Sequence, residues 1–316
     1  MKITIEEYQK QIKIERDTFF KNSFERAYQA FLELKYNEKE PSFFMDNASE
    51  IVEKMREQCW KDFLLEEKAF TSHMLEFLIV NEDYNGLNNT DSIRKYVEAF
   101  PDHIYQLCLS NTQSRRSRAG KEFEHIIELI FIGAGVPLDS QGNIGKEFFV
   151  EKGLGKLVDN VSPGVVEFDI NKRNAVLISA KTTLRERWQE VPEEMGRTGA
   201  REMFLATLDE KITDNVLNTL YEANIQLTTT ASNKEKNFKN NNRVLSFEEL
   251  IKICLDNAAK WEQFEYSEYQ ANQAIELLNK QVDKHSEHAI MKNAFENRLA
   301  HYYKYTKESI EDNSGK

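Results

Sequence analysis

The residues of this chain that could do chemistry together lie between positions 155 and 194. Asp159 precedes one short apolar run, Lys181 ends a second (AVLISAK), and Glu194 follows that lysine with twelve residues between them. Two carboxylates can hold Mg²⁺ against a phosphate, and a lysine cation can orient water and offset the charge that develops during hydrolysis. The pattern favours metal-dependent hydrolysis of a phosphodiester bond, although these residue types at loose spacing also occur by chance.

The run that ends in the lysine predicts which side chains share a face. The 21 residues between Asp159 and Lys181 leave room for one hairpin and its turn. Because side chains alternate along a strand, Ser179 should lie on the same face as Lys181, while Ala180 points away. The usual second acid of such a site would occupy position 179. Glu194 is therefore the candidate that replaces it.

Two other acids compete with Asp159 for the role of first metal ligand. Glu167 and Asp169 lie closer to Lys181 in the sequence. Their surroundings, VVEFD, are typical of an ordinary half-buried strand with polar partners, which favours Asp159. The choice between Asp159 and Asp169 remains open on the sequence alone.

Arg185, Glu186 and Arg187 form what we call the recognition segment. In the major groove, arginine donates two hydrogen bonds to guanine and glutamate accepts one from cytosine, so the segment has the chemistry to recognise two adjacent G·C pairs. The simpler alternative is a solvated helix face with an internal salt bridge, which contributes little. The segment begins four residues after Lys181, and this position favours recognition that is coupled to cutting.

Helical periodicity predicts helices over residues 4–34, 48–68, 72–80 and 92–109, the last interrupted near Pro101. Thr4 and Glu7 match a capping box at the first start, and Pro41 is expected to act as a stop signal. A basic run over residues 112–121 leads into an amphipathic helix that glycines end. The first hundred residues are therefore expected to be mostly helical.

The periodicity changes in the second half of the chain. Short β-branched and apolar runs predict strands over residues 165–170, 175–181, 202–208 and 225–230, with a helix over 212–224 and a loop over 233–242. Ser246 and Glu249 match a capping box that opens further helices. The fold class expected is α/β: a mixed β-sheet core flanked by helices, with a helical N-terminal region and a helical C-terminal segment.

Composition says more about the cellular compartment of the protein than about its binding partner. The net charge of −11 argues only weakly against nucleic acid, because binding depends on where basic groups cluster. Cys59, Cys108 and Cys254 are widely spaced and form no zinc pattern, which favours a reducing compartment. No apolar run approaches the ~20 residues that span a bilayer, so we expect a cytoplasmic protein without membrane contact.

Taken together, the pair VD, a gap of 19 residues, SAKTTLRER and then Glu194 resemble the type II restriction endonucleases of the EcoRII, SsoII and PspGI group, within the PD-(D/E)XK superfamily. The resemblance is closest from about Gln113 to Glu248. It implies a Mg²⁺-dependent homodimer that cuts double-stranded DNA at CCNGG, or CCWGG in some members, before the first cytosine to leave five-nucleotide 5′ overhangs. It also implies a cognate DNA methyltransferase in the same system.

The resemblance assigns a role to individual residues. It implies metal ligation by Asp159 and Glu194, catalysis by Lys181, and recognition of C·G pairs by the recognition segment. The other matches are Glu124 as a further acid near the site, Ser179 as the serine of the modified motif, and Gln113 as a minor-groove contact to the inner pair.

The group is also known for extruding the central nucleotide of its odd-length site, and Arg56 and Trp60 match the residues that hold the extruded base. An indole ring stacks on any base, which suits an unspecified nucleotide. Without the resemblance, the favoured interpretation of Trp60 is a core aromatic on an amphipathic helix.

By function we divide the chain into a mostly helical DNA-contacting region (residues 1–110), the catalytic core (111–250) and C-terminal helices (251–316). Two other function classes are kept: a DNA-binding protein on the same fold that does not cleave, and a non-enzymatic helical interaction protein. A longer site such as TCCNGGA also stays open, with Arg115, Arg116 and Arg118 as phosphate clamps or flank contacts.

Overall fold

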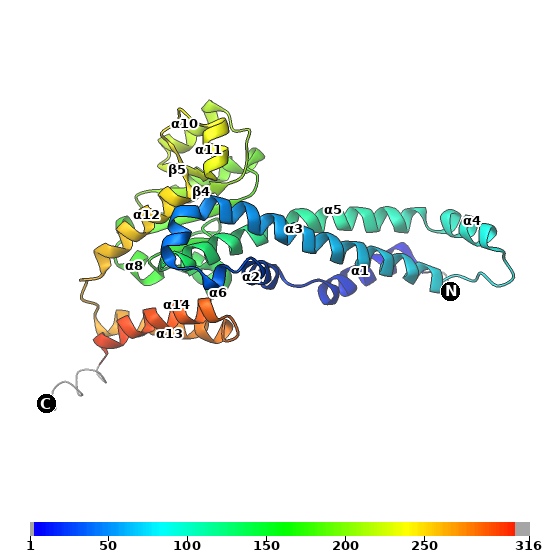
Figure 1. The fold of residues 1–316 in the computed structure, drawn as a ribbon, viewed down its shortest axis with the longest axis horizontal. Helices are drawn as coiled ribbons and strands as arrows, with labels where there is room; N and C mark the ends of the chain where they lie inside the picture. The colour runs from blue at the N-terminus through cyan, green and yellow to red at the C-terminus, as the bar shows by residue number, and fades with distance from the viewer. Residues whose placement is uncertain (1–2, 307–316) are drawn as a thin grey trace. The chain divides into compact units, whose positions relative to one another are not determined.

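The computed structural model describes residues 3–306, apart from the side chain of Arg187. Within this range the chain forms two compact units, each built from two stretches of sequence (Figure 1). The first contains residues up to 30 and residues 56–122, and the second contains residues 31–55 and those from 123 onward. The division into three parts proposed above rests on function and not on contacts, and it stays a prediction.

The first unit is helical, as expected. It contains α1 (Ile5–Phe19), most of α2 (Ser23–Glu33), all of α4 (Asn89–Ala99), and parts of α3 (Pro41–Val80) and α5 (Pro101–Gly133). Its core is a cluster of buried aromatic and aliphatic side chains that includes Tyr8, Phe63, Phe70, Met74 and Phe100.

The helix ends of this region differ in part from the prediction. The capping box of Thr4 and Glu7 is confirmed, but the single helix over residues 4–34 is wrong, because Phe20 adopts an extended conformation and ends α1. Pro41 begins α3 instead of stopping a helix, since the first residue of a helix needs no N–H donor. The separate helices over 48–68 and 72–80 form one uninterrupted stretch of α3, and a kink at Asn47 (φ −130°, ψ 17°) lies directly before it.

The second unit contains a six-stranded mixed sheet whose strands lie side by side in chain order. The first three strands pair antiparallel and the last four pair parallel, with β3 common to both sets. The strands are β1 (Asp139–Ser140), β2 (Asn160–Ser162), β3 (Val176–Lys181), β4 (Met203–Thr207), β5 (Ile225–Thr229) and β6 (Val244–Ser246). The mixed sheet flanked by helices confirms the expected fold class.

Helices of the second unit cover this sheet and extend beyond it. β3 is buried from Val176 to Ala180, as expected for an inner strand that pairs with β2 on one side and β4 on the other. In Figure 1, α13 and α14 lie side by side. The α-helices are α6 (Gln141–Ile144), α7 (Lys146–Glu151), α8 (Val165–Ile170), α9 (Glu190–Thr198), α10 (Asp214–Glu222), α11 (Ala231–Asn237), α12 (Phe247–Ala258), α13 (Glu268–Lys284) and α14 (Ala289–Tyr302). Short 3₁₀ helices are η1 (Tyr36–Glu38), η2 (Lys172–Asn174), η3 (Arg185–Gln189), η4 (Ala259–Trp261) and η5 (Tyr303–Tyr305).

Two elements of the second half were predicted wrongly. The run VVEFDI is helix α8, not a strand, because its apolar side chains pack against β2 and α13 and this packing overrides β propensity. The loop over residues 233–242 is helical up to Asn237, since the hydroxyl of Thr230 accepts a hydrogen bond from the Asn233 amide and caps α11.

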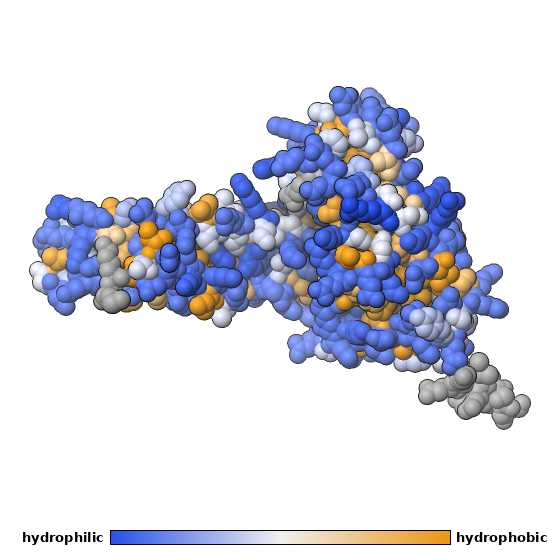
Figure 2. Space-filling model, turned by 180° about the vertical axis from the view of Figure 1, so that it is seen from behind, coloured by the Kyte–Doolittle hydropathy of each residue, from blue (hydrophilic) through white to orange (hydrophobic). Residues whose placement is uncertain are grey.

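The described residues include no helix that is long and apolar enough to cross a bilayer. Polar residues cover most of the face shown in Figure 2, and apolar residues form separate patches between them.

Candidate active site

Asp159 and Lys181 meet where β2 and β3 pair. The Asp159 amide donates to the Ile178 carbonyl at 2.9 Å, which places the aspartate beside the end of β3. Its Oδ2 accepts hydrogen bonds from the Ala180 amide at 2.6 Å and from Lys181 Nζ at 3.0 Å. Both side chains are largely buried, so water screens this ion pair less than it would a surface pair. The strand pairing thus fixes an aspartate–lysine pair on a rigid platform.

Glu194 is tied to the loop that leads into Asp159. Helix α9 is anchored by the buried side chains of Val191 and Met195, and it carries Glu194 with 8% of its surface exposed. Oε1 of Glu194 accepts hydrogen bonds from the Lys156 amide and, at 3.1 Å, from the Leu157 amide. Among the described residues, Oε2 has no hydrogen-bond partner. One oxygen is therefore fixed by the loop while the other remains available.

Gly155 makes this arrangement possible, and the sequence interpretation missed it. Its φ of +82° lies in the left-handed region, and a Cβ built there would lie 2.6 Å from Cδ of Glu194. Only a residue without a side chain lets the loop approach the glutamate this closely. The sequence signal was the glycine-containing stretch GLGKL directly before Val158 and Asp159.

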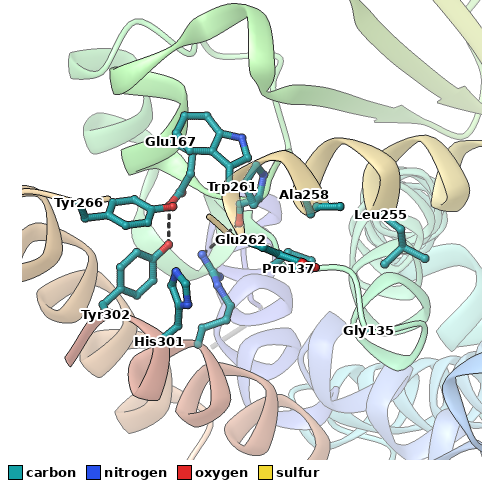
Figure 3. Close-up of a pocket in the computed structure, with 13 residues that line it drawn as sticks. Gly135, Pro137, Glu167, Leu255, Ala258, Trp261, Glu262, Tyr266, His301 and Tyr302 are labelled. Atoms are coloured by element: carbon teal, nitrogen blue, oxygen red, sulfur yellow. Dashed lines mark hydrogen bonds between the residues drawn. The ribbon is translucent and has the colours of Figure 1, made fainter. Parts of the chain in front are cut away.

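The two competing acids lie in other surroundings. Asp169 is on α8, largely exposed, and pairs with Lys152 at 3.2 Å. Glu167 is buried on the same helix and accepts hydrogen bonds from the hydroxyls of Tyr266, at 2.8 Å, and Tyr302. Figure 3 shows both hydroxyls directed toward Glu167, beside a cavity of 310 Å³. The geometry favours Asp159 as the acid beside Lys181.

Ser179 and Glu124 lie on the elements expected, Ser179 on β3 and Glu124 on α5. Ser179 is fully buried in β3, and within the described part of the chain its hydroxyl has no hydrogen-bond partner. Glu124 is half-buried on α5, one turn before Glu128.

Burial raises the pKa of Glu128, but hydrogen bonds from His125 and Ser140 outweigh it and leave that pKa below its ordinary value. Glu128 is thus a charged support for β1, a role that the sequence did not indicate.

The recognition segment forms the 3₁₀ helix η3 immediately after the β3 loop. Arg185 and Glu186 are exposed, and among the described side chains neither forms an ion pair. The internal salt bridge of the alternative interpretation is therefore not formed between Arg185 and Glu186. The backbone of Arg187 lies in the same turn.

Gln113, Arg56 and Trp60 belong to the first unit. Gln113 is exposed on α5, and Arg56 is exposed on α3. Trp60 has 43% of its surface exposed, so it is not a core aromatic. One face of its ring stacks on Phe63 with 5.7 Å between centroids, and the Arg115 guanidinium lies 5.7 Å from its centroid.

Comparison with known proteins identifies the family. The profile of the family described as EcoRII C terminal matches residues 82–251, more than half of the chain. The type II restriction enzyme SsoII of Shigella sonnei is 48% identical over 294 residues, which cover 93% of this chain and 96% of that enzyme. The chain belongs to the EcoRII C-terminal family of type II restriction endonucleases. As a type II restriction endonuclease it is a phosphodiester hydrolase that acts on DNA.

Two solved structures agree with the fold. Metal-depleted Ecl18kI in complex with uncleaved DNA is 46% identical, with a TM-score of 0.87 over 94% of this chain and 100% of that one. The complex of restriction endonuclease PspGI with substrate DNA is 18% identical, with a TM-score of 0.57 over 76% of this chain and 94% of that one, and supports the fold alone. Membership of the family sets aside the non-cleaving DNA-binding protein and the helical interaction protein.

Proposed function

We propose that this restriction endonuclease hydrolyses double-stranded DNA at CCNGG in the presence of Mg²⁺, before the first cytosine, to leave five-nucleotide 5′ overhangs. The observation that carries the proposal is the joint anchoring of three groups in the second unit. Asp159 is bonded to Lys181, Glu194 is bonded to the loop before Asp159, and the recognition segment lies in the chain between Lys181 and Glu194.

The donor set fits Mg²⁺. Asp159 and Glu194 offer hard carboxylate oxygens, and Oε2 of Glu194 is unengaged among the described residues. No group of three or more His, Cys, Asp or Glu side chains in residues 3–306 is arranged to hold a metal. Mg²⁺ is typically held by one or two carboxylates together with water and a substrate phosphate, so two acids suffice. When bound, the ion would supply charge stabilisation at the scissile phosphate.

Lys181 has the position of a catalytic cation. Its Nζ is held between Asp159 Oδ2 at 3.0 Å and the Ala180 carbonyl at 2.9 Å, so the ammonium group has a defined location. Two acceptors leave one of its three N–H donors for water or a phosphate oxygen. We assign it the orientation of the attacking water and the stabilisation of charge that develops on the phosphate.

Sequence recognition is assigned to the recognition segment, with Gln113 contacting the inner pair from the minor groove. The exposed side chains of Arg185 and Glu186 have the donor and acceptor groups for guanine and cytosine. Removing the central pair of an odd-length site from the stack would let its two half-sites engage a two-fold symmetric homodimer as though the extra pair were absent. Arg56 and Trp60 are proposed to hold the extruded nucleotide, and the exposed indole ring supports this.

The test is incubation of the purified protein and Mg²⁺ with CCNGG duplexes that differ in central and flanking bases. Cleavage of all of them, with ends mapped before the first cytosine, is the expected result. Cleavage confined to A·T centres would assign CCWGG, and a dependence on flanks would assign a longer site such as TCCNGGA. An intact duplex across all flanks would refute the proposal.

Extrusion has its own test. A fluorescent adenine analogue at the central position should brighten on binding in Ca²⁺, because it leaves the base stack. Unchanged emission with the DNA bound would contradict extrusion. The proposed setting is a cytoplasm that also contains a DNA methyltransferase of the same specificity, which would protect host sites.

A further inference from the structure

Asp209 lies just beyond the end of β4, and hydrogen bonds from its backbone to neighbouring residues hold it in place. Its amide donates to the Thr207 hydroxyl at 3.2 Å, and its carbonyl accepts from Asn233 Nδ2 at 3.1 Å. Asn233 is 8% exposed and also donates to the Thr229 hydroxyl at 2.8 Å. Asp209 is therefore fixed to the ends of two neighbouring parallel strands, β4 and β5.

The carboxylate of Asp209 reaches the chain that leads into the recognition segment. Its Oδ2 accepts a hydrogen bond from the Leu184 amide at 3.0 Å, while Oδ1 accepts one from the Lys211 amide at 3.1 Å. β3 and β4 are parallel with Lys181 opposite Thr207, so Leu184 and Asp209 leave the sheet at the same edge. The hydrogen bond thus ties the segment after the catalytic strand to its neighbour.

Leu184 is the last fixed point before the recognition segment. Its side chain is 2% exposed, and its amide is held by Asp209. The next residue, Arg185, has a φ of +43°, in a region that residues with side chains rarely adopt. An unusual turn at the first recognition residue must be maintained by its surroundings, and Asp209 supplies a hydrogen bond to the residue directly before it.

We propose that Asp209 is a positioning residue for sequence discrimination: it sets the start of the recognition segment relative to Lys181 without contacting DNA or metal. This rests on the recognition role given to Arg185 and Glu186 under the proposed function. Among the described residues, the hydrogen-bond partners of Asp209 are Leu184, Thr207, Lys211 and Asn233, and none of these is assigned a part in the chemical step. Its loss should therefore alter which sites are cut more than how the phosphate is hydrolysed.

The experiment compares Asp209→Ala, Asp209→Asn and a matched control, Asn241→Ala. Asn241 is a half-buried turn residue before β6 whose Oδ1 accepts from the Arg243 amide at 3.0 Å, so the control removes the same kind of hydrogen bond elsewhere. Each variant cleaves duplexes randomised over five base pairs, and sequencing gives kcat/KM for every site. Amide hydrogen exchange at Leu184 is measured on the same proteins.

For Asp209→Ala we expect the preference for the best site over sites with one changed G·C pair to fall at least about tenfold, the size expected when a hydrogen bond to a charged acceptor is lost. Leu184 exchange should accelerate. Asn retains only one acceptor oxygen for two amides, so Asp209→Asn should fall between Ala and wild type, and Asn241→Ala should match wild type. If Asp209→Ala does not fold, the site preference and Leu184 exchange of Asp209→Asn decide the role of Asp209.

Two results would overturn the inference: unchanged preference with faster Leu184 exchange, or a uniform loss of rate at all sites with the preference intact. Cleavage of the randomised duplexes by the wild-type enzyme tests the proposed function separately. If the wild type prefers a site other than CCNGG, that proposal fails, while the change in preference between wild type and Asp209 variants still decides the role of Asp209.

Discussion

Replacing Gly155 with alanine should disable the enzyme by moving Glu194. The new Cβ would lie 2.6 Å from Cδ of the glutamate and closer still to Oε1, and ordinary contact begins near 3.4 Å, so the carboxylate must shift by at least about 0.8 Å. Val191 and Met195 keep α9 in place, which leaves the side chain of Glu194 to move. A misplacement of about 1 Å at a reacting centre costs roughly a hundredfold in rate.

Gly153 provides a matched control in the same loop. Its φ of +75° is close to the +82° of Gly155, so alanine at either position should lose roughly 1 kcal/mol of stability to left-handed backbone strain. At Gly153, however, the nearest atom to a new Cβ is Lys172 Nζ at 3.7 Å, an ordinary contact. Gly155→Ala should lose at least about 1.5 kcal/mol more, because a charged acceptor gives up amide hydrogen bonds.

The assay is single-turnover cleavage of a CCNGG duplex with enzyme in excess and Mg²⁺ varied, alongside DNA affinity in Ca²⁺ and denaturant unfolding in EDTA. We expect the rate of Gly155→Ala to fall about a hundredfold while Gly153→Ala stays within about twofold of wild type. Equal rates for the two variants would refute the view that the loop positions Glu194.

Other outcomes can be checked with the same assays. Lys181→Ala should abolish cleavage and leave DNA binding in Ca²⁺ intact, since its charge acts on the reacting phosphate; loss of both would contradict that role. Glu167→Ala should lower the free energy of unfolding by roughly 3 kcal/mol, because two tyrosine hydroxyls lose a charged acceptor, while cleavage per folded molecule is unchanged; a cleavage defect with unaltered unfolding would show that Glu167 serves the site. Burial lowers the pKa of His285 from 6.5 to about 4, so the fold favours the neutral ring: stability is complete above pH 6.5 and declines toward pH 4. Urea titrations across this range should show a smaller decline for His285→Gln, and equal declines would exclude His285 as the cause.

The sequence predicted the catalytic strand well because its determinants are local. AVLISAK is β-branched and apolar, and it forms β3 almost over the predicted range. The capping boxes at Thr4 and Ser246 could likewise be predicted from the sequence, since each involves side chains three residues apart.

Elements set by distant contacts were harder to predict. The run VVEFDI has strand propensity, but burial of Glu167 between Tyr266 and Tyr302, about a hundred residues away, belongs to a helical arrangement. Pro41 likewise allows either the end or the beginning of a helix, and only the packing of α3 decides.

The supports of the candidate site show the same limit. That Gly155 must lack a side chain depends on where Glu194 arrives, 39 positions later, and the link from Asp209 to Leu184 depends on β3 and β4 being parallel neighbours. The residue types that we propose to cut and recognise DNA were visible in the sequence. The residues that hold them in place required the fold.

The central claim is that one segment, from Gly155 to Glu194, both cuts DNA and recognises its sequence. The most direct measurement is cleavage of two duplexes, CCNGG and a copy with one G·C pair inverted, each in Mg²⁺ and in EDTA. We expect rapid cleavage of CCNGG in Mg²⁺ and at least about tenfold slower cleavage of the inverted site, with no cleavage in EDTA. Equal cleavage of both duplexes, or cleavage in EDTA, would contradict it.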